Sequence, residues 1–132
     1  MSVGKKLNGD EMKKKLKSLK KLKLEADRVF SQYIRSRDNH HCYTCFAFMT
    51  PKFSQCGHYI SRNYLALRFD ERNAHCQCPQ CNIFKKGNMA VYAIMLEKEF
   101  GVGILQELEN IKLNNIGDTR IFLNGIIKKY AI

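Results

Sequence analysis

The sequence has no run of about 18 apolar residues, which is the length that a membrane-spanning helix requires. Its basic N-terminal segment has no apolar stretch of the kind that a secretory signal carries. It also lacks the Trp- and Phe-rich face of a helix that lies on a membrane surface. These absences favour an intracellular, cytoplasmic protein without a membrane partner. In such a protein the six cysteines indicate metal ligands rather than disulfides.

Acidic residues are scarce beside basic ones. The 132 residues include 12 Asp and Glu but 23 Lys and Arg, so the net charge is +11. Residues 1–37 hold 12 of the basic and 4 of the acidic residues, so most of the net charge lies in this segment. A basic arm on a mildly basic body is typical of proteins that bind a polyanion, here DNA. The alternative is a helix face that lysines keep solvated.

The spacing of apolar residues predicts a small α+β fold with a ββα core. The predicted elements are a long helix over residues 10–37 with Asp10 as its N-cap, short strands at 54–60 and 73–78, a helix from Pro79 to about Glu99, a helix around 105–111, and a last helix capped by Asp118 or Thr119. We expect three parts, namely a basic helical arm at 1–37, the ββα core at 38–101, and C-terminal helices at 102–132 that pack on the core.

Two paired-cysteine motifs predict a structural zinc site. Cys42 and Cys45 form one CxxC motif, and Cys78 and Cys81 form another. Each tight turn points two thiolates the same way, and two such turns complete the tetrahedron that zinc accepts in closed sites. Cys76 is then surplus, although on a strand it shares a face with Cys78 and competes for the ion.

A histidine and two asparagines accompany these motifs in the order strand, strand, helix. His58 lies on the first predicted strand, Asn73 begins the second, and Asn82 directly follows the last cysteine. This order is typical of HNH, or ββα-metal, nucleases. Phosphodiester hydrolysis needs a base such as neutral imidazole, a group that orients the imidazole, and a divalent ion at the phosphate. An Asn carbonyl oxygen suits Mg²⁺ or Mn²⁺.

Basic side chains around this site are expected to bind the phosphates of nucleic acid, because guanidinium pairs with phosphate through two hydrogen bonds. Those expected near the site are Arg62, Arg68, Arg72, Lys85 and Lys86. Those expected on the arm are Lys13, Lys14, Lys17, Lys20 and Lys21. The alternative for the arginines is surface pairing with Asp70 and Glu71, and both interpretations can hold at different arginines. The arm either binds DNA or pairs with a second copy in a homodimer.

Several stretches together resemble the phage NinG/Rap recombination-nuclease family. They are FSQYIRSRD (30–38), CYTC (42–45), GHYISR (57–62), LRFDERNAHCQCPQCN (67–82), KKGN (85–88) and VYAIMLEKEFG (91–101). The resemblance implies an HNH-like fold, structure-specific cleavage of branched DNA such as D-loops and Holliday junctions, and action in the host cytoplasm. By motif, His58 resembles the general base, Asn73 the residue that orients it, and Asn82 a ligand of the catalytic metal.

One position departs from many HNH enzymes, which carry an Asp just before the base histidine. This chain has Gly57 there, as the NinG-like pattern itself does. His75 is a candidate to supply the missing ligand, because it shares a strand face with Asn73. Two rival functions stay open. One is an HNH nicking or double-strand nuclease without branch preference, and the other is a zinc-containing DNA-binding module without catalysis.

Overall fold

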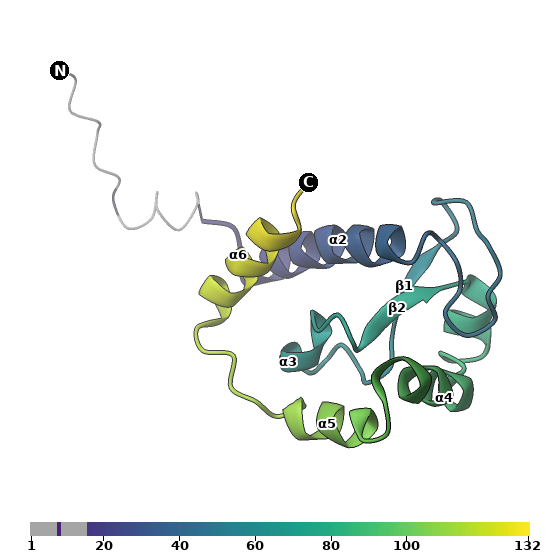
Figure 1. Cartoon of the computed structure of the whole chain (residues 1–132). Helices are drawn as coiled ribbons and strands as arrows, with labels where there is room; N and C mark the ends of the chain where they lie inside the picture. Colours follow the sequence, from purple (N-terminus) through teal and green to yellow (C-terminus); the bar gives the residue numbers. More distant parts are fainter. Residues whose placement is uncertain (1–7, 9–15) are drawn as a thin grey trace.

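The computed structural model describes residue 8 and residues 16–132 (Figure 1). The elements are α2 (Leu19–Arg37), β1 (Gln55–His58), α3 (Leu65–Arg68), β2 (Ala74–Gln77), a π-helix η1 (Gln80–Phe84), α4 (Met89–Phe100), α5 (Ile104–Ile111) and α6 (Thr119–Tyr130). Helices therefore surround a small two-stranded sheet, and the predicted α+β class is confirmed. None of the helices in the described residues is both long enough and apolar enough to cross a membrane.

The sheet has two faces with different neighbours. Strands β1 and β2 are antiparallel, with Gly57 opposite His75 and His58 opposite Ala74. Because side chains alternate along a strand and paired residues share a face, His58 and Ala74 lie on one face, and Gly57 and His75 lie on the other. Helix α2 packs on the face of His58, where Phe30 contacts the imidazole. Tyr92 of α4 contacts His75 on the opposite face.

The N-terminal helix is shorter than predicted. It begins at Leu19, and the side chain of Ser18 caps it by accepting a hydrogen bond of 3.1 Å from the Lys21 amide. A serine at this position satisfies an N–H of the first turn that has no partner within the helix. Residues 16–18 are not helical, so the prediction of one helix from residue 10 is wrong there. Asp10, the predicted cap, lies outside the described residues.

The first and last helices pack together and share an apolar cluster with the sheet (Figure 1). Members of this cluster are Leu22, Ala26, Val29, Phe30, Ile34, Phe69, Ala74, Leu123 and Tyr130. Asp118 caps α6 by accepting from the Ile121 amide at 2.9 Å, which confirms one of the two predicted caps. A second apolar cluster joins α3, α4 and α5. The three-part division of the chain stays a prediction.

The helix predicted from Pro79 to about Glu99 is interrupted. Pro79 does precede the helical turn of η1, but η1 ends at Phe84 and α4 begins only at Met89. Between them the backbone has positive φ at Lys86, Gly87 and Asn88, a conformation that no α-helix continues. The prediction of one continuous helix is therefore wrong.

Candidate functional site

The four predicted zinc ligands converge. The Sγ atoms of Cys42, Cys45, Cys78 and Cys81 all lie within 4.8 Å of one another, and those of Cys45 and Cys78 are 3.7 Å apart. In a tetrahedral site with Zn–S distances of about 2.3 Å, sulfur atoms are about 3.8 Å apart. The four cysteines could therefore hold a metal ion such as zinc. They form the only group of three or more His, Cys, Asp or Glu side chains with metal-ligand spacing in the described part of the chain.

Local hydrogen bonds shape both turns and favour the thiolate of Cys42. The Phe46 amide donates to the Cys42 carbonyl at 2.8 Å, which closes the first turn. The Cys81 amide donates to Cys78 Sγ at 3.4 Å, and the Asn88 side chain donates to Cys81 Sγ at 3.8 Å. Burial raises the pKa of the Cys42 thiol, but hydrogen bonds from Thr44 and from backbone amides outweigh it, so the net shift is downward. Such donors stabilise the anionic form that binds metal.

Cys76 is separate from the metal group. It pairs with Cys56 across the sheet, on the face that α2 covers, and its amide donates to Asp38 at 2.8 Å. Burial raises the pKa of the Cys76 thiol to about 11, so the thiol is protonated at neutral pH. This geometry agrees with the prediction that Cys78, and not Cys76, binds the metal ion.

His58 is held in one tautomer. Its Nε2 lies 2.8 Å from the carbonyl oxygen of Arg68. A carbonyl only accepts, so Nε2 carries the proton and Nδ1 of the neutral ring is an acceptor. Burial lowers the pKa of His58 below its ordinary value, and the hydrogen bond to Arg68 opposes this only in part. The imidazole is therefore neutral at pH 7, as a general base must be.

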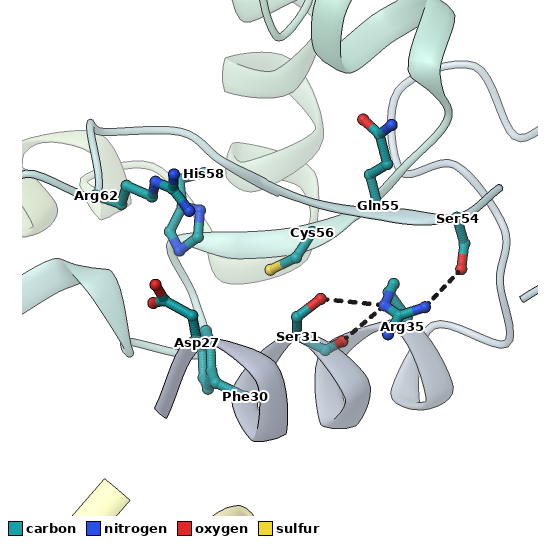
Figure 2. Close-up of a pocket in the computed structure, with 9 residues that line it drawn as sticks. All are labelled: Asp27, Phe30, Ser31, Arg35, Ser54, Gln55, Cys56, His58 and Arg62. Atoms are coloured by element: carbon teal, nitrogen blue, oxygen red, sulfur yellow. Dashed lines mark hydrogen bonds between the residues drawn. The ribbon is translucent and has the colours of Figure 1, made fainter. Parts of the chain in front are cut away.

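The imidazole of His58 and the side chain of Asn82 line the same open hollow. Cys56, Ser61, Arg62 and Asn82 complete the wall of this hollow, whose volume is about 370 Å³. The side-chain amide N–H of Asn82 donates to Gln55 Oε1 at 2.8 Å. The carbonyl oxygen of Asn82 takes no part in that bond. A neighbouring hollow on the α2 side includes Asp27, Phe30 and Arg35, and Figure 2 shows Arg62 beside His58. The structure thus brings His58, Asn82 and Arg62 together.

Asn73 does not contact the imidazole. Its side chain is buried, its Oδ1 accepts from the Ile60 amide at 2.8 Å, and its Nδ2 donates to the carbonyls of Ile60 and Leu67. The predicted hydrogen bond to His58 is therefore wrong, and the Arg68 carbonyl takes that place. Asn73 instead fixes both ends of the connection between the strands, which carries Arg68.

His75 lies on the wrong face of the sheet to join His58. It does share a face with Asn73, as predicted, but that face is the one that α4 covers. Its ring stacks on Tyr43 at 3.6 Å between centroids, and its Nδ1 lies 3.1 Å from the Tyr92 hydroxyl. The proposal that His75 binds the same catalytic ion as Asn82 is wrong for this reason.

The protonation of His75 makes stability depend on pH. Burial, with a smaller contribution from Arg37, lowers the pKa of His75 to about 3. The unfolded chain therefore binds a proton below about pH 6.5 that the folded chain refuses, so acid destabilises the fold. Between pH 7 and 5 we expect the His75→Gln variant to lose about 2 kcal/mol less unfolding free energy than the parent. Urea unfolding at both pH values measures this, and an equal loss would contradict it.

Two of the predicted phosphate-binding arginines are paired with carboxylates. Arg68 makes two hydrogen bonds to Asp27, at 2.8 and 2.5 Å. Arg72 bonds both Asp70 and Glu107, and these carboxylates raise its pKa. The alternative of pairing with Asp70 therefore holds for Arg72, whereas Arg68 pairs with Asp27, and Glu71 is a partner of neither.

The other predicted phosphate-binding residues differ in accessibility. Arg62, Lys85, Lys86, Lys20 and Lys21 are exposed. Lys17 forms a surface pair with Glu25 at 2.7 Å, which contributes little to stability. Lys13 and Lys14 lie outside the described residues.

Asp27 is a site residue that sequence patterns do not reveal. It lies on α2 and lines the hollow on that side of His58 (Figure 2). It also binds the guanidinium of Arg68, whose carbonyl oxygen accepts from His58. Asp27 thus anchors the Arg68 backbone to α2. Only the packing of α2 on the sheet brings it near the histidine, and no local motif signals that packing.

Together, the fold and the site define a small α+β protein with four cysteines that could hold a metal ion and, in a separate hollow, a half-buried histidine. The family described as "Bacteriophage Lambda NinG protein" matches residues 4–130, so the chain belongs to this family. Relatives called "Protein ninG" are 35% identical in Salmonella phage P22, 34% in Escherichia phage 933W and 33% in Escherichia phage lambda, each over 88 residues. These matches cover 65% of this chain but 43% of each relative. No solved structure matches the chain significantly.

Proposed function

We propose that this chain is an HNH-like, metal-dependent endonuclease that cleaves branched DNA recombination intermediates such as D-loops and Holliday junctions. The observation that supports this most strongly is the state of His58. Its Nε2 is bound to the Arg68 carbonyl, and its neutral Nδ1 is left as a base in the same hollow as Asn82 and Arg62.

In the proposed reaction, Nδ1 of His58 takes a proton from water as the water oxygen bonds to phosphorus. The ring becomes an imidazolium, and the Arg68 carbonyl stabilises it through the Nε2–H bond. Arg62 is exposed beside His58 and pairs with a phosphate oxygen. The phosphorus–oxygen bond to the leaving strand then breaks, and the leaving oxygen acquires a proton from solvent.

The hollow fits a divalent ion that is held by few protein ligands. Asn82 offers one carbonyl oxygen, which would hold Mg²⁺ or Mn²⁺ together with a DNA phosphate and several waters. Such an ion would stabilise negative charge on the leaving oxygen. Position 57 cannot supply a carboxylate, because a Cβ there would overlap the Gln77 side chain. Asp27 is held by Arg68, so we assign it a positioning role.

The missing carboxylate at position 57 also favours a second candidate function, that of a DNA-binding module without catalysis. A DNA-binding module without catalysis would have the same metal centre and the same basic surface, and it would need no carboxylate. The two functions differ in one observable, which is whether DNA is cut.

The preference for branches is tested with matched substrates. We expect a labelled four-way junction to be cut faster than a linear duplex made of the same arms, at saturating protein and with Mg²⁺ or Mn²⁺. Equal rates on the two substrates would replace the recombination function with that of a nuclease without branch preference.

A further inference from the structure

Several large apolar side chains beside the metal centre are exposed. Phe46 is 64% exposed and Phe84 is 75% exposed. The full set, which we call the aromatic rim, is Phe46, Phe48, Phe53, Ile83 and Phe84. We propose that the aromatic rim binds unpaired nucleotides of a DNA substrate by stacking on their bases. This inference rests on the proposed function and names the part of a branched substrate that the protein recognises.

The four-cysteine group brings the segments that carry Phe46 and Phe84 to one region. Phe46 directly follows Cys45, and Phe84 follows Cys81 in η1, while the sulfurs of these two cysteines share the metal group. In Figure 1 the loop that leads from α2 to β1 lies beside the segment that follows β2. The rim is also close in sequence to the hollow of His58. Phe84 is two residues from Asn82, which lines that hollow.

Phe46 contributes little to the stability of the fold. Its backbone has φ of +66°, a left-handed conformation that favours Gly or Asn over a bulky residue. Its ring is mostly exposed and buries little surface in return. A strained backbone that presents an exposed ring points to a partner outside the chain.

Charge identifies the class of partner. Residues 39–69 and 72–96 contain no Asp or Glu. Lys52 lies over the Phe53 ring at 5.7 Å, and Lys85 and Lys86 follow Phe84 on the surface. Aromatic faces among cations, without a carboxylate, suit single-stranded nucleic acid, whose bases stack while its phosphates pair. A second copy of this surface would bring like charges together, and a closed duplex keeps its bases covered.

A single tryptophan tests the proposal, because the chain has none. In the Phe84→Trp variant we expect emission to be quenched by junction DNA with an unpaired arm, and much less by the matched closed duplex. Ca²⁺ in place of Mg²⁺ keeps the DNA uncut. We expect Phe84→Ala to weaken binding to the unpaired substrate roughly 5- to 150-fold. Leu113, which is 84% exposed between α5 and α6, provides the control variant Leu113→Trp, whose emission should not change.

Three results would overturn this inference. One is DNA binding without quenching in Phe84→Trp, which leaves the proposed nuclease function standing. Another is equal weakening of duplex and unpaired substrates by Phe84→Ala. The third is that Phe84→Ala loses self-association in analytical ultracentrifugation while its DNA affinity is unchanged. That result would identify the rim as a dimer surface. If the parent binds no DNA at all, this inference and the proposed function fail together.

Discussion

Replacement of Cys78 by alanine is expected to abolish metal binding and unfold the region around the sheet. The apolar cluster at this place holds only Met49 beside Cys42, Cys76, Cys78 and Cys81, so the region between α2 and β1 has little apolar core of its own. Structural zinc contributes about 10–16 kcal/mol to the folding of small zinc-dependent peptides. Loss of a ligand should therefore lower the thermal midpoint by more than about 10 °C.

Cys76 provides a matched control for this experiment, because it is buried on β2, two residues before Cys78, and lies outside the metal group. We expect Cys76→Ala to keep one zinc ion per chain, measured by a chromophoric chelator after purification, and to lose about 1–2 kcal/mol from its small cavity. If Cys78→Ala kept its zinc and its melting temperature, the assignment of the metal centre would be incorrect.

Replacement of His58 by alanine is expected to reduce the cleavage rate by roughly 10²- to 10⁴-fold, the range for loss of a general base. The side chain is half-buried and bonded to a single carbonyl, so the fold and the zinc content should survive. Single-turnover rates at saturating protein separate this chemical step from DNA affinity. Circular dichroism and zinc content confirm that the variant is folded.

His41 is the control for this variant, because it is an exposed histidine and its Nδ1 bonds only the nearby Asn39 carbonyl. His41→Ala should cleave at the parental rate under the same single-turnover conditions. Parental activity in His58→Ala would show that another group activates the water, and the role assigned to Nδ1 would have to be abandoned.

The parts of this site that follow from short-range patterns could be predicted from the sequence. Two CxxC motifs place pairs of thiols within single turns, so the four cysteines that could hold a metal ion were identified without knowledge of the fold. The two strands, and the cap at Asp118, likewise follow from local residue types. The presence of His58 and Asn82 in one hollow follows from the strand, strand, helix order of their motifs.

The parts that depend on long-range packing could not be predicted. Alternation along β2 correctly put Asn73 and His75 on one face, but nothing in the sequence says which face α2 covers. The register of the two strands, which pairs His58 with Ala74, separates both residues from His58, and the packing of α2 brings Asp27 near it. The carboxylate partners of Arg68 and Arg72 lie 41 and 35 residues away along the chain, so no local pattern links these pairs.

The central claim is that the hollow around His58 cuts DNA. Its most direct test is incubation of the purified parental chain with a labelled four-way junction, with Mg²⁺ or Mn²⁺ and without added ion. We expect discrete cuts near the branch point that require the added ion. A junction that is bound but remains intact with either ion would contradict the claim, and would identify the chain as a zinc-containing DNA-binding module.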